Sequence, residues 1–223
     1  MPYFIECCCQ SAADASIAAA HGASRIELCE DLAHDGITPS EDNIRETLLA
    51  VTIPVNVLIR CRAGNFVYTD EEVEAMLHSI ALCRDLQVCT SEGEIRKVNA
   101  VVIGALNEEG NIDEAALTSM VAEARRHGST LAITFHRAFD VCCDPLKAYT
   151  DICSLGIERI LTSGHAPSAM DGRSLLTTLV ERSRSCPTQI LVGGGVRPSN
   201  INALAADTAA GEYHSSHLLW EEV

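Results

Sequence analysis

The stretch "DEAALTSMVAEARRHGSTLAITFHRAFD", residues 113–140, contains one unit of the pattern that decides the fold. Its first half predicts a helix over Asp113–His127, and Gly128 stands where that helix should end. The apolar run Leu131–Ala138 then predicts a buried strand. A helix that leads directly into a buried strand is typical of proteins in which helices cover a parallel sheet.

The same order of apolar run and helix-like segment recurs along the whole chain. The runs predict eight strands, over Phe4–Cys9, Arg25–Cys29, Val55–Arg60, Ala100–Leu106, Leu131–Ala138, Arg159–Ser163, Gln189–Gly193 and Glu212–Ser215. Between them we predict seven helices, over Asp14–His21, Ser40–Leu49, Asp70–Leu86, Asp113–His127, Pro145–Leu155, Ser174–Ser183 and Pro198–Ala205.

This regular alternation predicts an α/β fold, a (β/α)₈ TIM barrel that forms a single domain over residues 1–223. A doubly wound open sheet is the alternative, which the even spacing of eight strands makes less suitable. Residues 87–98, "QVCTSEGEIRKV", are expected to be a polar insertion before the fourth strand. The sequence ends at Val223, which leaves no room for a full eighth helix, so we expect a barrel open to a partner along one side.

The bulk composition limits the classes of partner. The chain of 223 residues has 16 basic and 31 acidic residues, a formal net charge of -15, and this surface should repel nucleic acid and anionic membranes. No apolar run approaches the length of roughly 18 residues that a membrane helix needs, and the first residues do not resemble a signal peptide. We therefore expect a cytoplasmic protein.

The chain contains 11 cysteines and no C-x-x-C motif, which argues against a structural zinc site and a thioredoxin-like centre. Most of the thiols are expected to be small buried hydrophobes. In "FIECCCQS", residues 4–11, successive side chains of a strand point to opposite faces. Cys7 and Cys9 then share one face, and Cys8 shares the other with Glu6. The three thiols therefore cannot converge on one metal ion, and only Cys8 is expected to face a site.

Polar residues gather at the carboxyl ends of the predicted strands, where a TIM barrel has its site. The candidates are Glu6, Arg25, Glu27, Arg60, Arg62, His136, Arg137, Asp140, Thr162, Ser163, His214 and Ser215. One charged residue at a strand end is usually solvated or in a structural ion pair, and a lone histidine is usually a hydrogen-bonded core group. Two glutamates, several arginines and a histidine at one mouth instead favour a functional site, because buried charges are costly unless paired.

The motif "LVGGGVRPSN", residues 191–200, adds three glycines at the end of the seventh strand. Gly193, Gly194 and Gly195 would allow the backbone to approach an anion, and barrels commonly bind phosphate after strands seven and eight. A tight turn beside a neighbouring strand explains the glycines equally well. Arginines in so acidic a chain also favour an anionic ligand, because the guanidinium matches carboxylate or phosphate.

Several motifs together resemble the CutC family. They are "RIELCE", "GITPS", "IPVNVLIRCRAGNFVYTD", "VVIGALNEEGNID", "TFHRAFD", "RILTSG", "GGGV" and "EYHSS", in the family's order from Glu6 to Ser216. The resemblance implies a cytosolic TIM barrel linked to copper homeostasis that commonly forms homo-oligomers. It also implies that Cys8 and Cys29 are Cu(I) ligands. The sequence departs from the family pattern in "RCRAGNF", where Cys61 replaces a proline and Asn65 an aspartate.

Two functions remain open. In the first, which the resemblance favours, Cys8 and Cys29 bind Cu(I), because soft thiolates suit this ion. In the second, the barrel is an enzyme that acts on a small phosphorylated or carboxylated metabolite. Its acid-base groups would be Glu6, Glu27, His136 and Asp140, and its anion clamp Arg60, Arg62 and Arg137. Nothing in the sequence indicates an organic cofactor.

Overall fold

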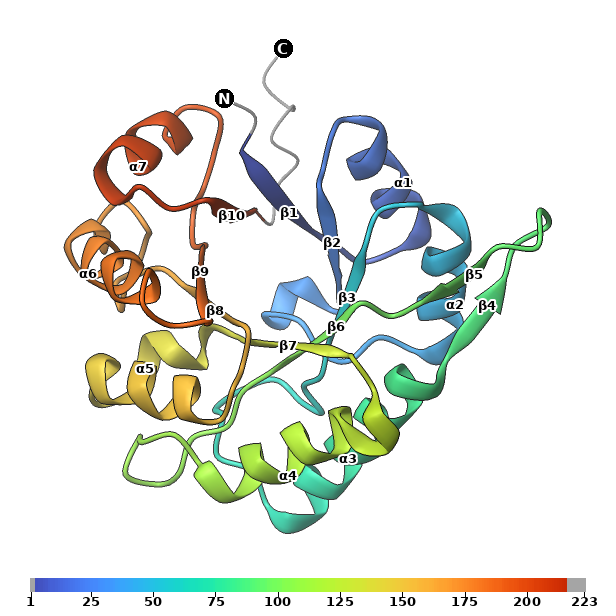
Figure 1. The fold of residues 1–223 in the computed structure, drawn as a ribbon, viewed down its shortest axis with the longest axis horizontal. Helices are drawn as coiled ribbons and strands as arrows, with labels where there is room; N and C mark the ends of the chain where they lie inside the picture. The colour runs from blue at the N-terminus through green and yellow to red at the C-terminus, as the bar shows by residue number, and fades with distance from the viewer. Residues whose placement is uncertain (1–2, 216–223) are drawn as a thin grey trace.

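A computed structural model describes residues 3–215 of the chain. Eight parallel strands form a closed barrel in the order β1-β10-β9-β8-β7-β6-β3-β2 (Figure 1). The strands are β1 (Phe4–Cys9), β2 (Arg25–Leu28), β3 (Val55–Leu58), β6 (Ala100–Ile103), β7 (Ala132–Phe135), β8 (Arg159–Thr162), β9 (Gln189–Val192) and β10 (Glu212–Ser215). The predicted (β/α)₈ barrel is confirmed. The predicted opening along one side is wrong, because β10 pairs with β1 and closes the ring.

Helices surround the ring of strands on its outside (Figure 1). Within residues 3–215 they are α1 (Ala12–Ala20), α2 (Glu41–Ala50), α3 (Asp70–Asp85), α4 (Glu114–Ala124), α5 (Pro145–Ser154), α6 (Arg173–Ser183) and α7 (Ile201–Thr208). The last begins three residues later than predicted, because Arg197 and Asn200 bond to each other in a turn. An eighth helix would lie outside the described residues. None of the described helices is long and apolar enough to cross a membrane.

The insertion at residues 87–98 forms a hairpin outside the barrel. Its strands β4 (Gln87–Cys89) and β5 (Ile95–Lys97) pair in antiparallel fashion. Arg96 anchors the hairpin, because its guanidinium donates to the backbone carbonyls of Leu48, Leu49 and Val51 at 3.3, 3.2 and 2.7 Å. These carbonyls belong to the end of α2, where a helix leaves its last acceptors without intrahelical donors.

The two faces of β1 contribute to different parts of the core. Cys7 and Cys9 belong to the large apolar cluster that also contains side chains of the surrounding helices. Cys8 belongs to a separate small cluster with Cys29, Leu58 and Val102. The alternation expected of a strand therefore holds for all three consecutive cysteines.

Candidate functional site

Two buried thiols lie side by side inside the barrel. The Sγ atoms of Cys8 and Cys29 are 3.4 Å apart. The pairing of β1 with β2 sets this distance, because Cys8 is opposite Glu27 and the N–H of Cys29 donates to the carbonyl of Cys9 at 3.0 Å. Leu58 and Val102 complete the small apolar cluster around the sulfurs. Only 8% of Cys8 and 1% of Cys29 is exposed, so water has little access to the pair.

A carboxylate and an imidazole complete this group. One ligand atom each from Cys8, Glu27 and His214 lie within 4.8 Å of one another, and all three residues are buried. Nε2 of His214 is 3.6 Å from a carboxylate oxygen of Glu27. These three atoms can bind a metal, and the sulfur of Cys29 lies beside that of Cys8 without belonging to the group. The resemblance to the CutC family pointed to the thiol pair, and the alternation along a strand put Glu27 on the same face as Cys29. Nothing in the sequence placed His214 beside the sulfurs.

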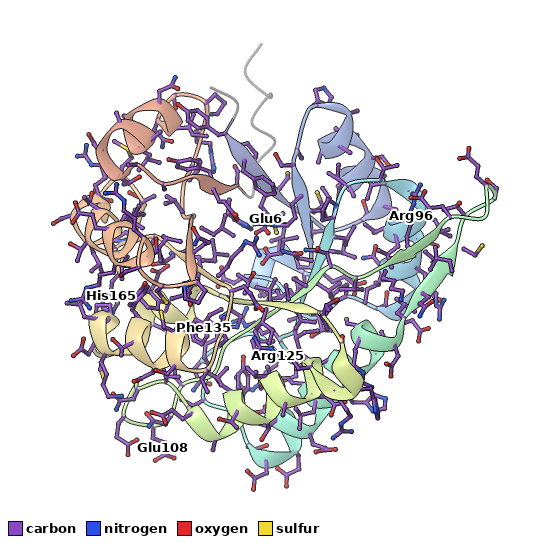
Figure 2. The ribbon with its side chains drawn as sticks, viewed as in Figure 1. Glu6, Arg96, Glu108, Arg125, Phe135 and His165 are labelled. Carbon is purple, nitrogen blue, oxygen red and sulfur yellow. The ribbon has the colours of Figure 1, made fainter. Side chains whose placement is uncertain are left out.

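Glu6 lies next to this group, two residues before Cys8 on the same face of β1, and inside the ring of strands in Figure 2. Its carboxylate accepts hydrogen bonds from Arg25 at 2.5 Å, from Asn56 at 3.0 Å and from Nδ1 of His214 at 2.8 Å. Burial would raise the pKa of Glu6, but the hydrogen bond from His214 and the charge of Arg25 lower it to about 2. Glu6 is therefore an ionised carboxylate that fixes the orientation of the His214 ring.

The ion pair of Arg25 with Glu6 is part of a larger network, which continues towards the amino-terminal ends of the strands. Arg25 also donates to Glu212 at 2.9 Å, and Glu212 accepts from Arg159 at the same distance. These contacts join β2, β10 and β8 across the interior. Arg25 is among the largest fully buried side chains of the described residues. Its charge is tolerated there because two carboxylates surround it.

The titrating groups beside the thiols are shifted by burial and by one another. Burial raises the pKa of Glu27, and the charge of His214 only partly opposes it. Burial would lower the pKa of His214, but the charges of Glu27 and Glu6 raise it. The pKa of Cys8 is raised by its contact with Cys29 and by burial. Cys8 is therefore a neutral thiol at neutral pH in the free protein.

His136 follows β7 directly, and only one of its two ring nitrogens has a hydrogen-bond partner among the described residues. Its Nδ1 accepts the N–H of Ala138 at 3.1 Å, while its Nε2 is buried with no partner among residues 3–215. Burial and the charge of Arg60 lower the pKa of His136 to about 3. The ring is neutral, and because Nδ1 accepts, its proton is assigned to Nε2. His136 therefore presents a hydrogen-bond donor rather than a base.

The strand beside β7 makes room for this ring. A Cβ atom at Gly104 would lie 2.5 Å from both Cε1 and Nδ1 of His136. Only glycine permits this approach, because no real Cβ comes so close to another side chain. The position of Gly104 directly after β6 thus fixes where the imidazole lies.

Arg60 and Arg62 differ in what they bind. Arg60 donates to four loop carbonyls, of His34, Asp35, Gly36 and Gly64, and forms no ion pair within the described part of the chain. Its guanidinium lies over the ring of Phe66 at 5.0 Å, and its Nε is buried without a hydrogen-bond partner among residues 3–215. Arg62 pairs with Glu72 and donates to Val67 O at 2.8 Å. The donors of Arg62 are thus engaged by its own loop and by the first turn of α3.

Asp140, Arg137, Thr162 and Ser163 form a second polar group, between the ends of β7 and β8. Asp140 accepts from Thr162 Oγ1 at 2.5 Å and from the N–H of Ser163 at 3.0 Å, and pairs with Arg137 at 2.8 Å. Arg137 also donates to Ser163 Oγ at 3.2 Å. Asp140 therefore connects two loops, and these contacts occupy both of its oxygens.

The glycine motif after β9 packs against its neighbours. A Cβ at Gly193 would lie 2.5 Å from Leu161, and one at Gly194 would lie 2.7 Å from the Cβ of Ser163. Gly194 and Gly195 have positive φ angles of 93° and 74°. Ser215 donates from its hydroxyl to the carbonyl of Val196 at 3.0 Å. Close packing accounts for Gly193 and Gly194, and an anion cradle at this loop stays a prediction.

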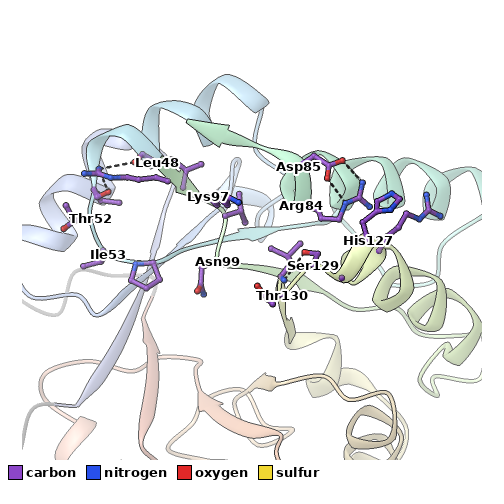
Figure 3. A pocket seen from close by; sticks show the side chains of 17 residues that line it. Leu48, Thr52, Ile53, Arg84, Asp85, Lys97, Asn99, His127, Ser129 and Thr130 are labelled. Carbon is purple, nitrogen blue, oxygen red and sulfur yellow. Dashed lines mark hydrogen bonds and ion pairs between the residues drawn. The ribbon is translucent and has the colours of Figure 1, made fainter. Parts of the chain in front are cut away.

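A hollow of about 660 Å³ opens at the opposite end of the barrel, where β3, β6 and β7 begin (Figure 3). Its lining includes Arg84, Arg96, Lys97 and Arg126. Arg84 and Arg96 are engaged with carboxylates and with carbonyls near helix ends. Because catalytic sites of TIM barrels lie at the other end, we assign Arg84 and Arg96 to the stability of the fold.

Comparison with known proteins identifies the family. The model of the CutC family matches residues 3–219. The chain belongs to the CutC family. The family protein CutC of Parabacteroides distasonis is 41% identical over 218 residues, which cover 97% of this chain and 83% of that protein. The copper homeostasis protein cutC homolog of Mus musculus is 37% identical over 214 residues, covering 96% and 73% of the two chains.

Solved structures agree with this assignment. The CutC structure from Streptococcus agalactiae has a TM-score of 0.84 and 30% identity, and covers 97% of this chain and 100% of that one. The structure of a 2,3-dimethylmalate lyase has a TM-score of 0.59 over 97% of this chain and 76% of that one. At 12% identity, it shows the barrel fold alone. The resemblance predicted from the sequence motifs is confirmed.

In this CutC family member, the sequence analysis missed three residues that hold the site together. Asn56 bonds Glu6, while Glu212 and Arg159 extend the network around Arg25. Asn56 could have been found from the sequence, because it is the polar residue in the apolar run "VNVL". It lies two residues before Leu58 on β3, so both side chains point into the barrel. Glu212 and Arg159 begin their strands, where a charged residue is ordinarily solvated.

Proposed function

We propose that this CutC protein binds Cu(I) through the thiolates of Cys8 and Cys29 and takes part in copper homeostasis. The observation that carries the proposal is the 3.4 Å separation of two buried sulfurs inside the barrel. Soft thiolate ligands select Cu(I). The name of the Mus musculus relative, a copper homeostasis protein, supports the same function. A cytoplasmic location and a homo-oligomer belong to this proposal.

The surroundings of the sulfurs suit a metal that must stay reduced. Leu58 and Val102 shield the pair from water. Thiols lose their protons when they bind a metal, so binding needs nearby proton acceptors. Glu27 lies beside Cys8, and its raised pKa suits it to take up such a proton. No comparable acceptor is needed for Cys7 and Cys9, which belong to the apolar cluster outside the barrel lumen.

An anaerobic titration with Cu(I) tests this function. The reduced protein competes with a chromophoric chelator, and we expect one tightly bound ion per chain. X-ray absorption at the copper edge should then show sulfur neighbours. Binding too weak to compete with the chelator, or a copper environment without sulfur, would refute the proposal.

A second candidate function rests on a different observation. Nε2 of His136, Oγ1 of Thr134 and Nε of Arg60 are all buried without a hydrogen-bond partner in the range 3–215. His136 and Arg60 both contact the ring of Phe66, so their polar atoms lie in one region of the barrel mouth. Unpaired buried donors are costly unless a ligand satisfies them. These donors fit an oxygen of a small phosphorylated or carboxylated substrate of an enzyme.

Ligand-induced stabilisation tests this second candidate. The wild-type protein and His136→Ala are screened for thermal shifts with phosphorylated and carboxylated metabolites. Each metabolite is used at a concentration about 100-fold above a Kd in the micromolar range. A genuine ligand at that excess stabilises the folded state by about 2.7 kcal/mol, which raises the Tm by about 5–11 °C. We expect the shift in the wild type and its loss in His136→Ala. An equal shift in both proteins would place the ligand elsewhere.

A further inference from the structure

A second pair of thiols lies on the outside of the barrel. Sγ of Cys153, in the last turn of α5, is 2.9 Å from Sγ of Cys186, in the turn that follows α6. Both residues are partly exposed, unlike Cys8 and Cys29. The proposed function does not use either residue.

We propose that Cys153 and Cys186 form a redox-active dithiol, a modification site that closes to a disulfide when the protein meets a low-molecular-weight disulfide such as oxidised glutathione. A disulfide bond needs a sulfur separation of roughly 2.05 Å, so the two sulfurs need to approach by roughly 0.9 Å. The turns that carry them are already connected, because Thr188 Oγ1 donates to the carbonyl of Ile157 at 2.7 Å. This bond holds the segments that carry the two sulfurs beside each other.

The surroundings distinguish the roles of the two thiols. Burial opposes ionisation of Cys186, but its contact with Cys153 and hydrogen bonds involving Thr188 lower its pKa below the ordinary value. The pKa of Cys153 is raised, by burial and by Cys186. Cys186 is also the less buried of the two thiols and so the more accessible to a disulfide in solution. The thiolate is the nucleophile in exchange reactions, so we assign Cys186 as the attacking residue and Cys153 as the resolving residue.

The exchange balances in two steps. The Cys186 thiolate attacks one sulfur of oxidised glutathione, whose S–S bond breaks to give a mixed disulfide and one glutathione thiolate. Cys153 then loses its proton to solvent and attacks the Cys186 sulfur, which forms the protein disulfide and releases the second glutathione thiolate. Both thiolates take up protons. The protein dithiol loses two electrons, and one molecule of oxidised glutathione becomes two of the reduced form.

The outer pair should react before the inner pair. Only 8% of Cys8 and 1% of Cys29 is exposed, so a disulfide in solution has little access to the inner pair. Cys153 and Cys186 are half-buried at the surface. Oxidation would thus be confined to the outer pair under conditions that leave the inner sulfurs as free thiols.

The test uses the full chain, first reduced and then equilibrated anaerobically with mixtures of reduced and oxidised glutathione. Free thiols are alkylated, and peptides are analysed by mass spectrometry. We expect a cross-link between the peptides that contain Cys153 and Cys186, and an increase in Tm of about 5 °C because the link restrains the unfolded chain. Cys153→Ser should instead trap a glutathionyl adduct on Cys186, and Cys186→Ser should carry far less adduct on Cys153.

The exposed cysteines provide matched controls. Cys89→Ser and Cys143→Ser should leave the cross-link and the rise in Tm unchanged, because neither residue contacts the pair. Wild-type protein with no Cys153–Cys186 cross-link would overturn the inference. A cross-link between Cys8 and Cys29 at a less oxidising glutathione ratio would also overturn it.

Discussion

Replacing Cys8 and Cys29 together by alanine is expected to lower the affinity for Cu(I) by more than about 100-fold, since loss of even an outer-shell partner costs a metal site about 10- to 100-fold. The reason is that the two sulfurs, 3.4 Å apart, are the soft ligands proposed for the inner site. Competition with a chromophoric chelator under anaerobic conditions measures the change. Circular dichroism of both proteins establishes that the variant is folded.

The same strand offers a matched control. Cys7→Ala with Cys9→Ala removes two thiols from the opposite face of β1, in the apolar cluster outside the lumen. This variant should keep the affinity of the wild type, as should His136→Ala, whose Nε2 lies at the other polar region of the mouth. Equal losses of affinity in the Cys8/Cys29 and Cys7/Cys9 variants would contradict the assignment of the ligands.

Replacing Arg25 by methionine is expected to lower the free energy of unfolding by about 3–5 kcal/mol, the usual cost of removing one partner of a buried ion pair. Glu6 would keep a carboxylate in the barrel interior without its guanidinium partner, and Glu212 would lose one of its two arginines. Urea denaturation followed by circular dichroism measures the change. The Cu(I) affinity should also fall, because Glu6 would no longer hold His214 in one orientation.

Arg45→Met is the matched control for this variant. Arg45 forms an exposed ion pair with Glu41 one turn away on α2, and such a pair contributes about 0.5 kcal/mol or less. Adding Glu6→Gln to Arg25→Met should restore part of the lost stability, because it removes the unpaired charge. A free energy of unfolding that changes no more in Arg25→Met than in Arg45→Met would show that the buried network is not stabilising.

The sequence was sufficient to predict the barrel, and its resemblance to the CutC family pointed to the inner thiol pair. Alternation along β1 separates Cys8 from Cys7 and Cys9, and the parity of β2 puts Glu27 on the inward face. Both follow from the period of two in a strand, which needs no knowledge of neighbours. The order of strands around the ring follows from the connection rules of β/α units.

The partners of the long side chains could not be predicted in the same way. Arg62 was expected at an anion site, but its guanidinium bonds Glu72 ten residues further along the chain. Asp140 was expected beside His136 as an acid-base group, but it connects the loops after β7 and β8. The alternation along a strand predicts the face to which a Cβ points. It does not predict where the end of a long side chain lies, because several rotatable bonds allow it to reach many partners, and the cost of desolvation decides among them.

The close approach of Gly104 to His136 restricts the order in which this protein can evolve. A methyl group at residue 104 would lie 2.5 Å from two atoms of the imidazole. Alanine at 104 therefore becomes acceptable only after 136 has lost its ring, and a lineage that acquires the changes in the reverse order passes through an overpacked intermediate. As long as His136 is retained, substitution of Gly104 is therefore selected against.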